Sequence, residues 1–241
     1  MLTPVLLLML LLPGLRRMRR SAPDKSLRLY RLMSWGLGGI VLGAMAAQET
    51  ILLLAGQLTW ATGLPLHLCS LMGLTVLPAL VTRRETLLSA LLYAGVPGAA
   101  LALLFPAVAD TPWPGLTRFF FLLMHAGIVL SPLLPMAAGW RPRPMGALRA
   151  GLFLLGAGIA ASIANALTGG NYLFLAGPVA GTPLVLLARR GRGAYRLLLA
   201  ILAILVLAGE AAFVRIADAG RKRPPPEGWN LPKIGERHGR L

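Results

Sequence analysis

The chain has 241 residues, of which 56% are hydrophobic and 13% are charged; its mean hydropathy is +0.71 and its formal net charge is +16. Charged residues make up about a quarter of soluble globular domains, so this composition excludes a soluble domain and predicts a protein embedded in a bilayer. The basic excess does not predict nucleic-acid binding, because the charges fall in short segments between apolar stretches and in a proline-rich tail. We expect these charges to orient the protein and to contact membrane lipids.

Apolar stretches of membrane-crossing length recur along the chain, and about 20 apolar residues of helix suffice to cross a bilayer. Six of them lie at residues 33–56, 64–81, 86–105, 118–139, 147–168 and 194–217. Residues 1–15 are also apolar, but about 15 helical residues reach only about 22 Å, so they predict a weak seventh span. Four arginines follow this stretch rather than precede it, which argues against a cleaved signal peptide.

The segment 169–188 is apolar but is interrupted by glycines and prolines. We expect it to stay outside as a re-entrant or irregular segment, because 19 of the 24 basic residues then lie inside; crossing would lower that number to 16. The sequence thus predicts an all-α, polytopic transmembrane bundle of about seven spans over residues 1–217. The N-terminus is expected outside the cell membrane, and residues 218–241 form a basic, proline-rich cytosolic tail that we expect to be disordered.

Cys69 is the only cysteine of the chain, which excludes intrachain disulfides and cysteine-based metal clusters. The sequence contains no Walker loop, zinc signature or GxSxG motif. We therefore expect no cofactor and no bound metal.

Polar side chains of the predicted spans gather on the outer side of the membrane. The residues that share this depth are Gln48, Glu49, His67, Cys69, Arg118, His125, Asn165, Asn171 and Tyr172. Polar groups inside a membrane are costly, so they mark functional sites by default. The sequence therefore predicts an outer-leaflet polar pocket around Cys69, His67 and His125.

Helix geometry assigns roles within this pocket. Pro65 suits a first helical turn, so a helix starting there would hold Cys69 near its N-terminus, where the dipole favours a thiolate. His67 and Cys69 are two residues apart and point to opposite sides of a helix, so His125 is the better base. Arg118 lies seven residues before His125, on the same face, and is placed to hold a phosphate or carboxylate.

Structural interpretations compete with these roles. A lone buried cysteine also serves as a small hydrophobe, and histidine commonly hydrogen-bonds between membrane helices. Glu49 fits a hydrogen-bond anchor or a proton carrier equally well. Two sets of small residues, Gly39/Gly43/Ala47 and Gly158/Ser162/Asn165, have the spacing of close helix contacts.

Three motifs carry a resemblance to a known family: LPLHLCS at residues 64–70, RFFFLLMH at 118–125 and NALTGGNYLFLAGP at 165–178. Together and in this order they resemble the YwaF-like family of bacterial polytopic membrane proteins. That resemblance implies a bundle of about seven spans. A more distant similarity connects the chain to a eukaryotic transmembrane family that moves acyl groups onto lysophospholipids through a cysteine. It implies that Cys69 is the nucleophile, assisted by His67 or His125.

Two functions of different class follow. In the first, the protein is a cysteine-dependent lipid acyltransferase or acyl hydrolase: Cys69 attacks an acyl ester, His125 moves the proton, and Arg118 with Asn171 holds the headgroup. In the second, the same pocket binds a small solute or a proton for transport or sensing, with Glu49 titrating.

Overall fold

The computed structural model describes residues 2–20, 23–178 and 181–219, and all regular secondary structure in this part is helical. The α-helices are α1 (Leu2–Arg20), α2 (Pro23–Leu54), α3 (Leu68–Thr82), α4 (Glu85–Ala90), α5 (Val96–Leu104), α6 (Pro114–Leu130), α7 (Leu133–Ala137), α8 (Met145–Thr168) and α9 (Arg192–Ala219). A π-helical turn, η1 (Leu91–Gly95), joins α4 to α5. Residues 220–241, which hold most of the predicted tail, lie outside the described part.

Five segments of the described chain are helical, long and apolar enough to cross a membrane: Lys25–Leu54, Glu85–Leu104, Pro114–Ala137, Met145–Thr168 and Arg192–Ala217. The helix α3 is apolar but has only 15 residues, and α1 does not meet the same criteria. The all-helical bundle is therefore confirmed, whereas the count of seven spans is not.

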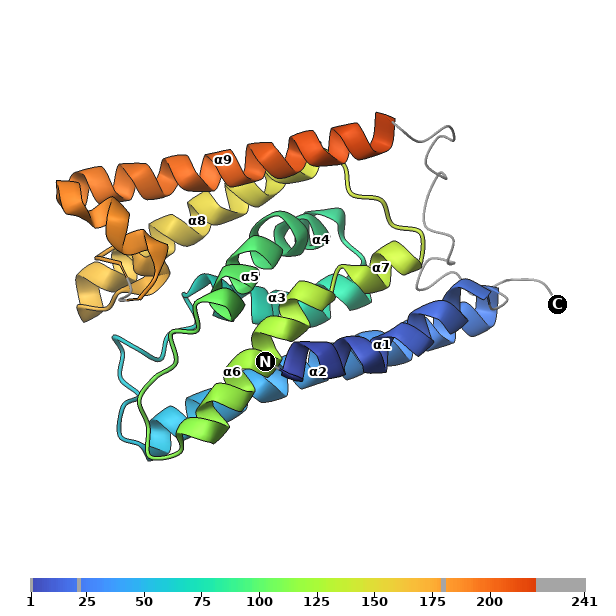
Figure 1. Cartoon of the computed structure of the whole chain (residues 1–241), viewed down its shortest axis with the longest axis horizontal. Helices are drawn as coiled ribbons and strands as arrows, with labels where there is room; N and C mark the ends of the chain where they lie inside the picture. The colour runs from blue at the N-terminus through green and yellow to red at the C-terminus, as the bar shows by residue number, and fades with distance from the viewer. Residues whose placement is uncertain (1, 21–22, 179–180, 220–241) are drawn as a thin grey trace.

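The segment between α8 and α9 is irregular, as the sequence predicts. Its described part holds two short 3₁₀ helices, η2 (Tyr172–Phe174) and η3 (Pro183–Arg190), in place of a long helix. Both lie at the end of the molecule where α8 meets α9 (Figure 1). The glycines and prolines of this segment explain the interruption, because each disfavours a continuous helix.

Glycines allow the closest helix contacts of the core, at positions that the small-residue pattern does not identify. A Cβ at Gly38 would lie 2.6 Å from Leu77 Cδ1, and one at Gly127 would collide with Val41 Cγ2. Gly39, Gly43 and Gly158 have no atom within 4 Å of that position. The expected contacts at these three glycines are therefore wrong, and α2 packs through the neighbouring face.

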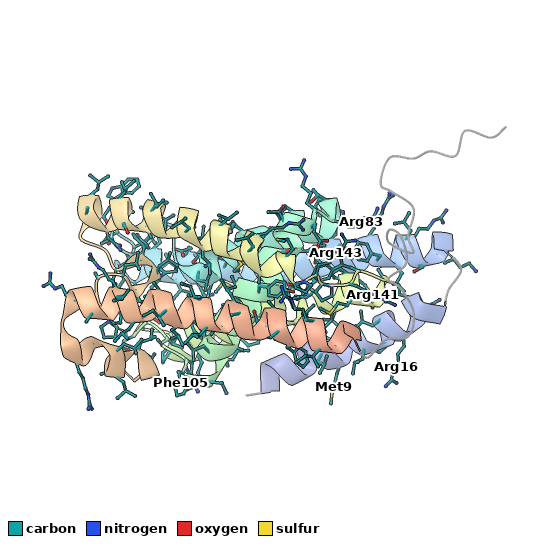
Figure 2. The ribbon with its side chains drawn as sticks, turned by 90° about the horizontal axis from the view of Figure 1, so that it is seen from above. Met9, Arg16, Arg83, Phe105, Arg141 and Arg143 are labelled. Atoms are coloured by element: carbon teal, nitrogen blue, oxygen red, sulfur yellow. The ribbon has the colours of Figure 1, made fainter. Side chains whose placement is uncertain are left out.

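The two ends of the bundle differ in charge. Loops 55–67 and 105–113 and the described residues 169–178 and 181–191 lie at one end, which we call the loop end (Figure 1). At the other, which we call the basic end, Figure 2 places Arg16, Arg83, Arg141 and Arg143. The helix α2 runs toward the loop end, whereas α3 and α6 both start there. Hydrogen bonds connect the loops: Gln57 Nε2 donates to Asp110 O at 2.7 Å.

The outward surfaces of α8 and α9 are apolar. Side chains of α8 more than half exposed recur at helical spacing, at Leu148, Leu152, Leu155, Ile159 and Ile163. On α9 the same holds for Leu197, Ile204, Leu205, Phe213 and Ile216. Surfaces of this kind face hydrocarbon in a membrane protein.

Candidate functional site

Cys69 is the second residue of α3, at the loop end. The helix begins at Leu68, with extended His67 (φ −72°, ψ 148°) as its N-cap. Pro65 thus lies before the helix and not in its first turn. The His67 side chain does not cap the helix, so the first-turn amides around Cys69 have no side-chain acceptor there. Free amides at a helix start favour negative charge.

The packing of α2 on α3 brings Glu49 to the level of Cys69. A Cβ atom added at Gly73 would lie 3.5 Å from Met45 Sδ, so α2 and α3 approach closely at this point. These helices run in opposite directions. One turn nearer the loop end, α2 carries Glu49, four residues after Met45, and α3 carries Cys69, four residues before Gly73. Residues four apart share a helix face. Glu49 and Cys69 therefore both project toward the seam between α2 and α3.

The packing of α3 on α6 brings His125 to the same level. The Cβ position at Gly95 lies 3.2 Å from Met72 Cγ and 3.4 Å from Ile128 Cγ2, so these two residues mark one layer. Both helices run away from the loop end, and Cys69 and His125 each precede that layer by three residues. Residues three apart also share a face. Cys69 thus lies between the helix that carries Glu49 and the helix that carries His125.

His125 is held in one tautomer. Its side chain is 2% exposed, and its Nδ1 lies 2.7 Å from Phe121 O. A carbonyl oxygen only accepts hydrogen bonds, so Nδ1 carries the proton and Nε2 keeps a lone pair. The Phe121 ring, 4.1 Å away between centroids, restrains the imidazole further. The arrangement leaves Nε2 able to accept a proton.

Two more polar residues of α2 lie beside this site. Gln48 Nε2 approaches Phe120 O at 3.5 Å and Met124 Sδ at 3.6 Å, which ties α2 to α6. Glu49 Oε2 is buried and has no hydrogen-bond partner among the described residues. A buried carboxylate oxygen without a partner is costly, so Glu49 is a group that a ligand or proton would satisfy.

Arg118 lies in the first turns of α6, two turns nearer the loop end than His125. Its side chain is exposed, whereas His125, seven residues later, is buried. Arg118 therefore lies at the outer surface of α6 near the loop end, where a charged group is hydrated or contacts a headgroup.

Asn165 and Tyr172 fix the loop that leads into α3. Asn165 Nδ2 donates to Tyr172 O at 3.0 Å, and Tyr172 N donates to Asn165 Oδ1 at 2.7 Å. The Tyr172 hydroxyl donates to Trp60 O at 2.8 Å and accepts from Leu64 N at 3.0 Å. Tyr172 is fully buried, so these bonds position the chain just before His67 and Cys69.

Asn171 closes the neighbouring turn. Its Oδ1 accepts from Ala176 N at 2.9 Å and from Gly177 N at 3.2 Å, and its Nδ2 donates to Gly177 O at 2.9 Å. This side chain is committed to the turn and holds the segment 171–177 together.

His67 packs against that turn. Its ring centroid lies 5.1 Å from that of Tyr172 and 5.4 Å from that of Phe174. Burial lowers the pKa of His67 below its ordinary value of 6.5. Phe174 and Leu173 have φ values of 57° and 52°, the left-handed region that side chains rarely adopt. The strained turn therefore lies directly against the residue that caps α3.

Trp60 and Tyr195 belong to this assembly although the sequence analysis did not select them. Trp60 contributes a backbone carbonyl, which no sequence pattern reveals. Tyr195, at the start of α9, donates to Phe174 O at 2.8 Å. The only signal for Tyr195 is a tyrosine among arginines next to an apolar span, where an aromatic residue is already expected as an interface anchor.

No group of three His, Cys, Asp or Glu residues within the described part could hold a metal ion. Several spanning helices and a polar cluster near one end define a multi-pass membrane protein. The chain matches the TMEM164 family over residues 1–212 and belongs to that family. The narrower YwaF-like resemblance is not confirmed. No curated protein and no solved structure matched the chain.

Proposed function

We propose that this protein transfers acyl groups between membrane lipids, with Cys69 as the nucleophile and His125 as the base. The supporting observation is that Met72 on α3 and Ile128 on α6 meet at Gly95. Cys69 and His125 each precede this pair by three residues on helices that run in the same direction. The free Nε2 lone pair of His125 adds to it, because a thiol needs a base to become a thiolate.

The reaction balances within these residues and a lipid ester. His125 Nε2 takes the thiol proton, and Cys69 Sγ attacks the ester carbonyl carbon. The carbon–oxygen bond breaks, and the departing alcohol of the lysolipid takes the proton back from His125. A second lysolipid hydroxyl then attacks the thioester, the carbon–sulfur bond breaks, and Sγ regains a proton through His125.

The surroundings favour this chemistry. First-turn amides of α3 that no side chain caps can stabilise the oxyanion of the tetrahedral intermediate. Exposed Arg118 can hold a lipid phosphate outside the buried site. Ester groups of phospholipids lie near headgroup depth, as does an N-terminal helical turn at the loop end.

The test uses the purified full chain in vesicles of phosphatidylethanolamine and phosphatidylglycerol, with a labelled acyl donor and an unlabelled lysolipid acceptor. We expect label in the acceptor and a hydroxylamine-sensitive acyl mass on the Cys69 peptide. Both are lost in Cys69→Ala and kept in Ser162→Ala, whose hydroxyl bonds only to its own helix at Gly158 O. Folded wild-type protein without transfer or an acyl mass contradicts the proposal.

Cys69→Ala, together with Glu49→Gln, distinguishes acyl transfer from the alternative function of solute or proton binding. If Cys69→Ala leaves function intact while Glu49→Gln abolishes uptake or binding of a solute, the pocket serves transport or sensing and the acyltransferase proposal fails. The unpartnered Glu49 Oε2 is the observation that favours this second function.

We also propose that the basic end faces the cytosol, with the N-terminus outside. The support is the concentration of arginines there, since cytoplasmic loops carry an excess of Lys and Arg. A membrane-impermeant thiol reagent tests it in a Cys69→Ala background: Thr59→Cys should react in intact cells and Thr86→Cys should not. The reverse pattern contradicts the orientation.

A further inference from the structure

A cleft lies near the basic end, on the surface where α2 meets α3. It has a volume of about 240 Å³ and is lined by Tyr30, Arg31, Ser34, Trp35 and Val81. The four residues of α2 form two neighbouring pairs at helical spacing, and Val81 supplies the opposite wall from the last turn of α3. We call it the basic-end cleft.

The inner wall of the cleft is polar. Tyr30 is fully buried, and its hydroxyl donates to Leu80 O at 2.8 Å. Ser34 is 1% exposed, and its side chain hydrogen-bonds with that of Tyr30. A serine hydroxyl has one proton and two lone pairs, so Ser34 can form a further hydrogen bond to a ligand hydroxyl at this wall.

The mouth of the cleft is positively charged. Arg31 lines it and is exposed. Arg83, the C-cap of α3 at φ 55°, is close enough to interact with both Tyr30 and Arg31: burial lowers the pKa of Arg83, Tyr30 raises it, and the charge of Arg31 lowers it. An anion placed at the mouth would offset the repulsion between the two guanidinium groups.

The rim toward the membrane is apolar. Trp35 is 59% exposed and Leu32 on the same helix is 70% exposed. Tryptophan at such a position lies at the boundary between headgroups and hydrocarbon. The volume is below the roughly 300 Å³ at which pockets enclose whole drug-sized molecules, so the cleft suits a headgroup whose acyl chains remain in the bilayer.

We propose that the basic-end cleft binds the headgroup of an anionic phospholipid, with the phosphate against Arg31 and a headgroup hydroxyl against Ser34. The combination of a cationic mouth, a polar inner wall and an apolar rim matches a phosphoglycerol headgroup at each part. The site lies at the opposite end from Cys69 and does not depend on the acyltransferase proposal.

The experiment measures lipid binding to the detergent-solubilised full chain by native mass spectrometry. We expect dioleoyl-phosphatidylglycerol to bind more tightly than dioleoyl-phosphatidylcholine. Arg31→Gln should weaken binding about tenfold, the effect of one charge-assisted hydrogen bond. Ser34→Ala, which keeps the charge and removes only the hydroxyl oxygen, should weaken it about threefold. Arg215→Gln removes the same charge from exposed α9 and should leave the affinity unchanged.

Three outcomes would overturn the proposal. Equal losses in Arg31→Gln and Arg215→Gln would mean unspecific attraction to a basic surface. Equal binding of the two lipids by wild type would mean that the anionic headgroup is not recognised. Binding of inorganic phosphate as tight as that of phosphatidylglycerol would mean that the cleft takes a free anion and not a lipid. Ser34→Ala tests the same cleft independently of the charge at Arg31.

Discussion

The loop end and the basic end of this bundle are built from different interactions. At the loop end, neutral groups form hydrogen bonds between loops, and buried Tyr172 joins the backbone at Trp60 and Leu64. At the basic end a charged contact accompanies the buried hydrogen bond from Tyr30 to Leu80 O: Glu85 accepts a hydrogen bond from Trp140 and pairs with Arg149. Neutral, buried contacts hold a geometry independently of salt, whereas exposed ion pairs contribute little and are screened. The loop end is therefore suited to hold a reactive site rigidly.

The largest expected effect concerns the chemistry of the loop end. His125→Gln keeps the size and polarity of the side chain but removes the basic nitrogen, so we expect acyl transfer to fall about a hundredfold or more. The measurement is label transfer in the vesicle assay, with thermal unfolding to verify folding. Activity within about threefold of wild type would exclude His125 as the base.

Tyr172→Phe tests whether the neutral network supports that site. It leaves the Trp60 carbonyl and the Leu64 amide without their buried partner, so we expect a loss of about 1–3 kcal/mol in stability. Thermal unfolding in detergent measures it. Tyr195→Phe is the matched control, because it removes one hydrogen bond, to Phe174 O, and should cost less. Equal and negligible losses would mean that the loops are held by packing alone.

Glu85→Gln tests the charged contact at the other end. The amide oxygen can still accept from Trp140 Nε1, and the pair with Arg149 is 3.6 Å long with both side chains about one-third exposed. We therefore expect a loss below about 1 kcal/mol that shrinks as salt is raised. A loss of stability larger than that in Tyr172→Phe would reverse the contrast between the two ends.

The smallest effect is the pH dependence contributed by His67. Burial lowers its pKa in the folded state below the ordinary 6.5, so the unfolded chain binds the proton more readily. Stability is fully present above about pH 6.5 and decreases as pH falls toward the folded-state pKa. His67→Gln should reduce this slope in thermal unfolding between pH 7 and about pH 5. An unchanged slope would show that His67 does not contribute.

The sequence predicted the membrane class, the approximate positions of the apolar helices and the irregular segment 169–188. These depend on composition, run length and helix-breaking residues, which are local properties. The start of α3 was misplaced, because Pro65 fits a first helical turn as well as the loop that Tyr172 holds in place. Contacts with residues far away in the sequence, such as Tyr172, determine where α3 begins.

The residues through which helices contact each other were harder to predict than the membrane spans. In a helix that is apolar all round, no pattern tells which side meets a neighbour. Gly38 and Gly127 make the close contacts, while the better-spaced Gly39 and Gly43 face outward. The roles of Asn165 and Tyr172 in the turn depend on backbone groups of other segments, which the sequence cannot reveal.

The position of the Cys69 thiol against α6 can be measured by cross-linking. In His125→Cys the chain has two thiols, and dibromobimane becomes fluorescent only when it bridges two neighbouring sulfur atoms. The account predicts rapid fluorescence and a single intrachain adduct for this variant, and none for Leu155→Cys on the lipid-facing side of α8. If folded His125→Cys protein reacts at each thiol separately without bridging, the two side chains do not meet and the proposed catalytic pair does not exist.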